Sequence, residues 1–254
     1  MNITVLGCSG SLSAPGNPAS GYLVQLADAG AVLLDIGPGV LAKLQEVCNP
    51  SQVHVALSHL HPDHCLDFPS LMVWRRFHPE LAAQGHNHCI GPQATFEHLG
   101  RLSADSPNEI DDMSDTFTFT PWVAHQPQTI PGVTITPYPV NHPIESYALR
   151  LTDHSIGEII AYSGDSAYTE ELVDCAKDAD VFLCEATWGA TSEGKTPNMH
   201  LSGAEAGIIA TKAAVKRLVL VHIPPWVNPQ DALDAARQHY DGPIELAYSG
   251  MVID

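Results

Sequence analysis

The sequence has few basic residues and no long hydrophobic run. Eleven lysines and arginines stand against 29 aspartates and glutamates, so the formal net charge is −18. A field of this sign repels polyanions and therefore disfavours extended binding to nucleic acid. No apolar stretch approaches the ~20 residues needed to span a bilayer, and the chain opens with Met1-Asn2-Ile3 rather than a basic leader. We expect a cytoplasmic protein that has no membrane partner.

Cysteine motifs and low-complexity segments are also lacking. The 6 cysteines are scattered and form no C-x-x-C pair, which fits reduced, buried thiols better than a disulfide framework. Glycine (19) and proline (20) are only slightly enriched and 44% of the chain is hydrophobic, which excludes collagen-like and disordered classes. No linker divides the 254 residues, so we expect one domain over residues 1–254.

Hydrophobic periodicity divides the chain into two β-rich stretches, each followed by helices. The first half predicts strands at 2–7, 21–27, 31–37 and 53–58, and helices at 38–47 and 65–77. A second stretch predicts strands at 116–124, 132–140, 146–151 and 158–164. Helices at 169–178, 202–215 and 229–240 then alternate with strands at 181–186, 217–223 and 244–249. This order predicts an α/β fold of two packed sheets flanked by helices.

One short segment concentrates side chains that bind metals. His59, His61, Asp63 and His64 form the pattern H-x-H-x-D-H directly after the predicted strand 53–58. In an extended segment, residues i and i+2 project to the same side, so His59 and His61 can hold one ion. Asp63 and His64, on the following turn, can reach a second ion. A solvated polar loop is the alternative interpretation, and four ligand side chains at this spacing disfavour it.

The other histidines lack such a context. His86 and His88 repeat the H-x-H spacing, but they lie in a predicted polar loop without a carboxylate at ligand spacing. We expect no function for the isolated histidines, which are His54, His78, His98, His125, His154 and His239. The glycine- and serine-rich turn after residue 7 lacks the Gly-Lys-Ser/Thr ending of a phosphate-binding loop, and we expect it to form tight turns or line the site.

The H-x-H-x-D-H segment after a short strand resembles the metallo-β-lactamase superfamily, and the resemblance covers essentially the whole chain. It implies a four-layer αβ/βα sandwich of two mixed sheets with two divalent metal ions between them. The family pattern continues at His142 in Y-P-V-N-H-P, Asp165 in Y-S-G-D-S and His222 in L-V-L-V-H-I. The resemblance assigns all seven ligands: His59, His61 and His142 to one ion, Asp63, His64 and His222 to the other, and Asp165 to both. Zinc is favoured, and manganese, iron or magnesium are alternatives.

The second half resembles the ribonuclease Z and phosphodiesterase branch of that superfamily. Glu185 in F-L-C-E-A-T-W and His200 in M-H-L-S-G-A-E-A-G match its conserved glutamate and histidine. The resemblance implies that His200, oriented by Glu185, protonates the leaving group, that Asp63 orients the attacking hydroxide besides binding metal, and that the protein is a homodimer. A structural interpretation is compatible with this one, because Ser202 can cap a helix and form a capping box with Glu205.

The expected substrate is a small cyclic nucleotide. Ribonuclease Z carries a long basic arm in its second half and a basic residue in its N-terminal loop. In this sequence the short interval from Asp165 to His200 has no such arm, and the N-terminal loop S-A-P-G-N-P-A-S-G-Y has no lysine or arginine. The segments G-C-S-G-S, H-L-S-G-A-E-A-G and H-I-P-P-W resemble actinobacterial phosphodiesterases that act on 3′,5′-cyclic AMP. We therefore expect hydrolysis of cyclic AMP to 5′-AMP by a hydroxide that bridges two metals. Cleavage of tRNA 3′ ends, another (thio)esterase activity and a non-catalytic binding module are the alternatives.

Overall fold

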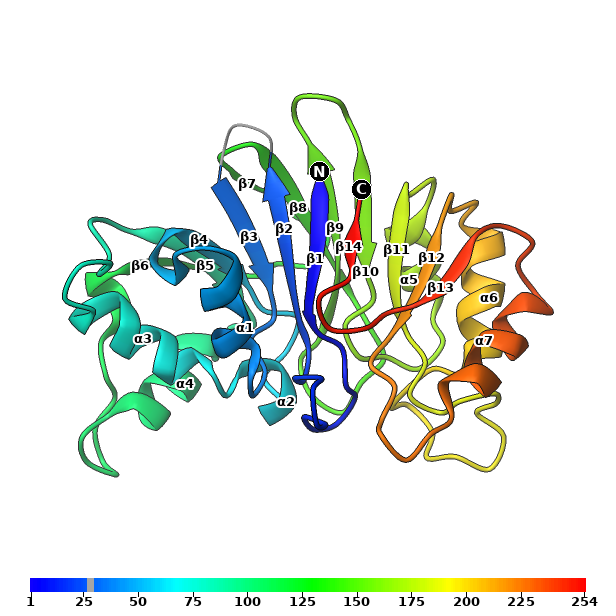
Figure 1. Cartoon of the computed structure of the whole chain (residues 1–254), viewed down its shortest axis with the longest axis horizontal. Helices are drawn as coiled ribbons and strands as arrows, with labels where there is room; N and C mark the ends of the chain where they lie inside the picture. The colour runs from blue at the N-terminus through cyan, green and yellow to red at the C-terminus, as the bar shows by residue number, and fades with distance from the viewer. Residues whose placement is uncertain (27–29) are drawn as a thin grey trace.

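Two seven-stranded mixed sheets form the centre of the computed structural model, which describes residues 1–26 and 30–254 (Figure 1). The first sheet has the order β14 (Val252–Ile253), β1 (Asn2–Gly7), β2 (Gly21–Leu26), β3 (Gly30–Leu34), β4 (Val53–Ala56), β5 (Asn87–Gly91), β6 (Phe117–Pro121). The second has the order β13 (Ile244–Leu246), β12 (Leu218–Val221), β11 (Val181–Glu185), β10 (Ile159–Tyr162), β9 (Tyr147–Asp153), β8 (Val133–Pro139), β7 (Gln128–Ile130). The predicted α/β class and the two-sheet architecture are confirmed.

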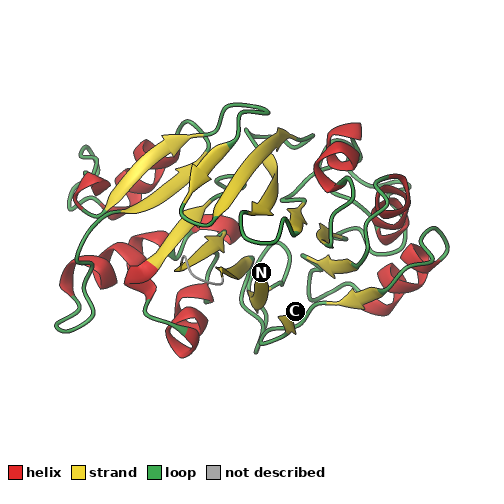
Figure 2. Ribbon diagram, turned by 90° about the horizontal axis from the view of Figure 1, so that it is seen from above, coloured by secondary structure: helices red, strands yellow, loops and turns green. Residues whose placement is uncertain are grey.

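Helices cover the outer face of each sheet, as Figures 1 and 2 show. The first sheet carries α1 (Val40–Val47), α2 (Pro62–Cys65), α3 (Phe68–Phe77) and α4 (Thr95–Ser103), with short 3₁₀ turns at Pro50–Gln52 and Met113–Asp115. The second sheet carries α5 (Glu170–Ala176), α6 (Gly203–Lys212) and α7 (Pro229–Arg237). The layers therefore follow the order helix, sheet, sheet, helix. No helix of the described residues is long and apolar enough to cross a membrane.

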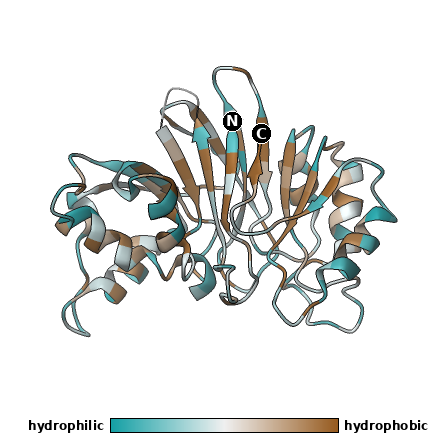
Figure 3. Ribbon diagram, in the orientation of Figure 1, coloured by the Kyte–Doolittle hydropathy of each residue, from teal (hydrophilic) through white to brown (hydrophobic). Residues whose placement is uncertain are grey.

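Apolar side chains fill all three spaces between these layers. Val24 and Leu34 of the first sheet belong to the same buried cluster as Leu149 and Leu183 of the second. Separate clusters lie between each sheet and its helices, and the strands are accordingly mostly apolar in Figure 3. Strands covered on both faces need near-continuous apolar sequences, which explains runs such as L-V-L-V in β12.

The region between α3 and β6 differs from the prediction. Residues 87–91, which include His88 of the expected polar loop, form β5 between β4 and β6, and residues 95–103, for which no helix was predicted, form α4. The sequence signal was weak because the segment N-H-C-I-G contains only two adjacent apolar side chains, those of Cys89 and Ile90. His54, expected to be isolated, lies beside His88 in the structure: the two residues are on β4 and β5, and their ring centroids are 5.1 Å apart.

Two further expectations change in the structure. β6 belongs to the first sheet, although its sequence opened the second β-rich stretch. The strand expected at 21–27 ends at Leu26, and Ala27 lies outside the described residues.

All six cysteines are free, and five of them are buried, as expected for reduced thiols.

Close packing of α6 against α7 depends on glycine. A Cβ atom at Gly203 would lie 2.0 Å from the backbone oxygen of Ala232, which cannot move without displacing α7. We expect Gly203→Ala to lower the free energy of unfolding by roughly 1–3 kcal/mol through overpacking, measured by denaturant titration. Gly85→Ala is the control, because its Cβ would meet nothing within 4 Å. A stability loss equal for both variants would contradict this explanation.

Candidate metal centre

The candidate site lies at one edge of the sandwich, where strands of both sheets end. Asp165 follows β10, Glu185 ends β11 and His222 follows β12. These three strands are parallel neighbours, so their carboxyl ends meet at one edge of the second sheet. The H-x-H-x-D-H segment follows β4 of the first sheet and leads into α2. Tertiary structure thus brings the distant motifs to one place.

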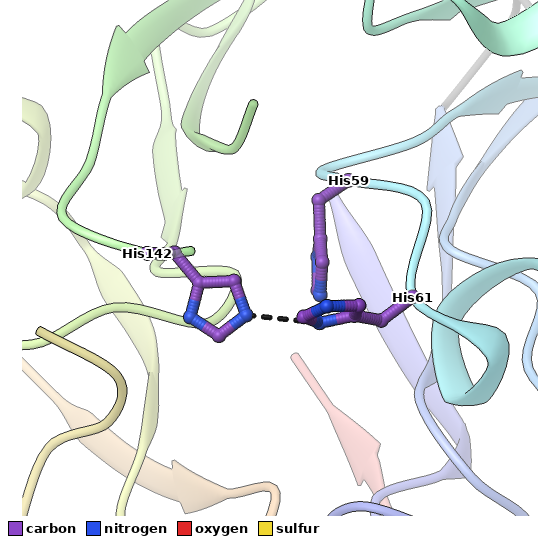
Figure 4. Close-up of side chains that lie close together, drawn as sticks. All are labelled: His59, His61 and His142. Atoms are coloured by element: carbon purple, nitrogen blue, oxygen red, sulfur yellow. Dashed lines mark hydrogen bonds between the residues drawn. The ribbon is translucent and has the colours of Figure 1, made fainter. Parts of the chain in front are cut away.

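The first group of candidate ligands consists of three histidines. One ring nitrogen each of His59, His61 and His142 lies within 4.8 Å of the other two. His142 Nε2 is 3.0 Å from His61 Nδ1 (Figure 4). His59 is fully buried, whereas His61 and His142 are half-buried. The rings converge from two segments that are far apart in the sequence.

The second group consists of Asp63, His64, Asp165 and His222, whose ligand atoms also lie within 4.8 Å of one another. His222 Nε2 is 3.0 Å from Asp63 Oδ2 and 3.2 Å from His64 Nε2. His64 Nε2 is 3.2 Å from Asp165 Oδ1. All four side chains are buried or nearly so.

Asp165 connects the two groups. Its Oδ1 faces His64, while its Oδ2 lies 3.7 Å from His59 Nε2 in the first group. The carboxylate therefore has one oxygen directed to each group, which is the arrangement that a shared ligand requires.

The donor atoms fit a divalent metal. Two of the candidate ligand atoms, His59 Nε2 and Asp165 Oδ1, are among the buried polar atoms of the described residues that have no hydrogen-bond partner. Such an atom costs about 1–3 kcal/mol if nothing satisfies it, and one metal ion in each group would satisfy the two atoms. Imidazole nitrogens and carboxylate oxygens together suit zinc, manganese or iron.

The pKa shifts of most of these groups favour the protonation states that bind a cation. Burial lowers the pKa of His59 and of His142, which keeps both rings neutral with a free lone pair. Burial alone would raise the pKa of Asp165, but the imidazoles of His222 and His64 hold it well below its usual range. Burial alone would lower the pKa of His64, but Asp165 and Asp35 raise it well above its usual range. A metal must therefore displace a proton from His64.

Hydrogen bonds behind the ligands fix the orientation of two imidazoles. His64 Nδ1 donates to Asp35 Oδ2 at 2.7 Å, and His142 Nδ1 donates to the carbonyl of Met199 at 2.8 Å. Each ring then directs Nε2 to the site, as metal-binding histidines do. Asp35, which was not among the predicted site residues, follows β3 with a positive φ of 58°. The sequence signal that could have found Asp35 is a carboxylate directly after the apolar run A-V-L-L, because a carboxylate buried at the end of such a strand needs a hydrogen-bond donor.

Glu185 and His200 lie beside the candidate ligands. His200 Nδ1 donates to the fully buried Glu185 Oε1 at 3.1 Å. Burial alone would lower the pKa of His200, but Glu185 raises it to about 9, so the ring is protonated at neutral pH. The predicted capping box of Ser202 and Glu205 is present and fixes the start of α6 just after His200. The structural and functional interpretations of this segment are thus compatible.

A cavity of about 180 Å³ joins these elements. Its lining contains ligands from both groups together with His200 and the N-terminal turn, namely Ser11, His61, Asp63, His142, Asp165, Met199 and His200. A molecule held there can touch the candidate ligands and His200 at the same time.

Comparison with known proteins identifies the family. Residues 31–223 match the family model described as the beta-lactamase superfamily domain. The chain belongs to the metallo-β-lactamase superfamily. An uncharacterized protein of Mycobacterium leprae is 48% identical over 254 residues, covering 100% of this chain and 88% of that protein. The probable metallo-hydrolase YhfI of Bacillus subtilis is 32% identical over 257 residues, covering 99% of both.

Solved structures show the same fold. The crystal structure of YhfI matches with a TM-score of 0.86 at 29% identity, over 99% of this chain and 98% of that one. The short form of human tRNase Z matches with a TM-score of 0.79 at 19% identity, over 100% of this chain and 99% of that one. The predicted family and the four-layer fold are confirmed. The chain is a metallo-hydrolase of this fold, with histidine and aspartate clusters suited to a divalent metal.

The structure brings together all seven predicted ligands, and it brings Glu185 beside His200; their roles stay predictions. The histidines that were expected to have no function lie outside both groups. His86, for example, contacts the carbonyl of Ser114, and His154 contacts the hydroxyl of Thr134.

Removing a shared ligand tests the metal centre. We expect Asp165→Ala to lose most bound metal, because both groups depend on its carboxylate, and His61→Ala to lose part of it. Elemental analysis after dialysis against a metal-free buffer measures this. His154→Ala, which removes an exposed histidine outside the site, should keep the wild-type content. Wild-type protein that contains no metal and stays active in chelator would contradict the assignment.

Proposed function

We propose that the chain is a metal-dependent phosphodiesterase that hydrolyses a 3′,5′-cyclic nucleotide, with cyclic AMP converted to 5′-AMP. The observation that carries this proposal is the Glu185–His200 pair, because its histidine lines the same cavity as the candidate metal ligands. Opening a cyclic phosphodiester expels a ribose alkoxide, and an alkoxide needs a proton. A histidine held protonated by a buried glutamate beside the hydrolytic site supplies one.

Charge supports a small substrate. The residues that line the cavity include no lysine or arginine, and the whole chain carries a net charge of −18. A single phosphodiester has one negative charge, which two divalent ions more than offset. A tRNA presents many phosphates, and the acidic surface would repel them. The balance therefore favours a ligand with one phosphate.

The protein groups then have distinct roles in hydrolysis. Two divalent ions, for which we propose zinc, would be held by His59, His61 and His142 and by Asp63, His64 and His222, with Asp165 shared. Divalent ions in such a site supply a hydroxide nucleophile at neutral pH and offset phosphate charge. Asp63 orients the nucleophile through its carboxylate. His200 Nδ1 stays bound to Glu185, so its Nε2 proton passes to the leaving oxygen.

Two other activities remain candidates within the same hydrolytic class. The first is tRNA 3′-end cleavage by a ribonuclease Z-type enzyme, and human tRNase Z is among the proteins with a similar structure. Another (thio)esterase activity would use the same ligands but would not require a proton for a thiolate leaving group, so it leaves the Glu185–His200 pair unexplained.

We also propose that the enzyme is a homodimer, which light scattering on the purified protein would measure.

A comparison of hydrolysis rates on different substrates tests the proposed activity. We expect the metal-loaded protein to hydrolyse cyclic AMP to 5′-AMP with a kcat/KM well above that for precursor tRNA. The cyclic AMP reaction should also show little of the steep salt dependence that multiple phosphate contacts produce. Cyclic GMP, a 2′,3′-cyclic nucleotide and a thioester belong in the same assay. Accurate tRNA 3′-end cleavage with cyclic AMP untouched would reverse the assignment in favour of ribonuclease Z.

Removing His200 tests its role as the acid. We expect His200→Ala to keep its metal and to lose on the order of 10²–10⁴ in kcat on a substrate with an alkoxide leaving group. The loss should be much smaller for a p-nitrophenolate leaving group, which departs without a proton. Equal losses on both substrates, or loss of metal, would assign His200 to structure or coordination.

The pH dependence of the hydrolysis rate gives a second test of His200 as the acid. Because Glu185 raises the pKa of His200 to about 9, the acid is protonated at neutral pH and the rate should fall as pH rises through about 9. Glu185→Gln removes the charge that raises this pKa, so the fall should move to lower pH.

A further inference from the structure

Two buried carboxylates behind the site have the same arrangement. On the first sheet, Asp35 binds His64 Nδ1 directly at 2.7 Å. It also accepts from the hydroxyl of Ser58 at 2.7 Å, and that hydroxyl lies 3.0 Å from His59 Nδ1. The backbone N–H of Ser58 donates to the same carboxylate at 2.7 Å. Asp35 thus reaches one imidazole directly and a second one through a hydroxyl group.

Glu185 repeats this arrangement on the second sheet. It binds His200 Nδ1 directly, and it accepts from the hydroxyl of Thr187 at 2.6 Å. That hydroxyl lies 2.9 Å from His222 Nδ1. The backbone N–H of Thr187 also donates to Glu185, at 3.3 Å. Thr187 therefore stands between the carboxylate of the proton-donor pair and a candidate metal ligand.

The direction of these hydrogen bonds follows from the proton count. The Thr187 hydroxyl has one proton and two possible oxygen acceptors, Glu185 Oε2 at 2.6 Å and the carbonyl of His222 at 3.0 Å. The shorter contact with the carboxylate takes the proton, because charge-assisted hydrogen bonds are the stronger ones. The hydroxyl oxygen then accepts a proton from His222 Nδ1. His222 Nε2 keeps its lone pair, and it is this nitrogen that faces Asp63 and His64.

The opposite direction would be unfavourable on two counts. A Thr187 hydroxyl that donated to His222 Nδ1 would require the ring proton on Nε2, which points at the candidate ligands. It would also leave Glu185 Oε2 with only the longer contact to the Thr187 backbone N–H. A buried carboxylate oxygen without a strong donor is costly.

We propose that Thr187 is a positioning residue that fixes the tautomer of His222 for metal binding, with Glu185 as the final acceptor. This inference rests on the metal-binding part of the proposed function. It gives Glu185 two tasks: the carboxylate orients His200 directly and orients His222 through Thr187. The metal and the proton donor are thereby held by a single buried group.

Removing the Thr187 hydroxyl tests the proposal. Thr187→Val keeps the shape of the side chain but has no hydroxyl, so we expect one of two zinc ions to bind about 10–100-fold more weakly. Thr187→Ser restores the hydroxyl and should restore the wild-type affinity. Competition with a chromophoric chelator measures the affinity for each ion. Thr95→Val is the control, since Thr95 is buried too and donates only to the carbonyl of Pro92.

A spectroscopic readout separates the tautomer from packing. In zinc-loaded protein labelled with ¹⁵N-histidine, the His222 Nδ1–H signal should be protected from exchange in the wild type and in Thr187→Ser. In Thr187→Val the same signal should exchange rapidly with water. Wild-type affinity for both ions in Thr187→Val, or equal losses in the valine and serine variants, would overturn the proposal.

The titration also distinguishes this inference from the proposed function. No substrate enters it, so a failure to hydrolyse cyclic AMP does not alter its result. A wild-type protein that binds no zinc would overturn both the metal centre and the role of Thr187. A wild-type protein that binds two ions beside an unaffected Thr187→Val would overturn the role of Thr187 alone.

Discussion

The carboxylate of Asp165 is the group on which the site depends. It is almost completely buried, yet the imidazoles around it hold it ionised. A buried charge needs compensation, and the compensating rings come from different sheets: His64 follows β4 and His222 follows β12. The two sheets must therefore meet at this edge with their strand ends aligned. The apolar core between them supplies that alignment, because it fixes how the inner faces pack.

A second layer of polar groups ties the sheets together behind the ligands. Asp35 lies at the end of β3 in the first sheet, and the hydroxyl of Tyr162 from β10 of the second sheet donates to it at 2.7 Å. Tyr162 packs against Tyr22 in the core, with ring centroids 5.1 Å apart. The orientation of His64 is thus connected through Asp35 to the packing of both sheets. Several hydrogen bonds to one buried carboxylate restrict its motion and that of His64, and a metal site requires rigid ligands.

The strongly acidic composition is physically compatible with the anionic substrate that we propose. The net charge of −18 acts over the whole surface and is screened by salt. Inside the cavity the local charge is set by imidazoles, carboxylates and any bound cation. His200, held protonated by Glu185, adds a positive group at the same place. A ligand with one phosphate meets mainly this local field, whereas a long polyanion meets the surface.

The sequence by itself determined the elements whose signals are local. His59, His61, Asp63 and His64 were predictable because an extended segment and the turn after it place them together without help from the rest of the chain. Most strands and helices of the second sheet were predictable for a similar reason, since their apolar periodicity is strong. The resemblance to a family then located His142, Asp165 and His222, which spacing alone does not connect.

Only the tertiary structure decided the features that depend on contacts between distant segments. β5 and α4 were missed because their apolar signal is short, and pairing with β4 and β6 stabilises β5 regardless of propensity. Asp35, Ser58 and Thr187 were missed because an aspartate, serine or threonine at the end of a strand looks like any other polar residue at that position. Their importance comes from hydrogen bonds to particular ring nitrogens, and the bonds of Asp35 and Thr187 form only when the carboxyl ends of neighbouring strands in one sheet come together, β3 beside β4 for Asp35 and β11 beside β12 for Thr187.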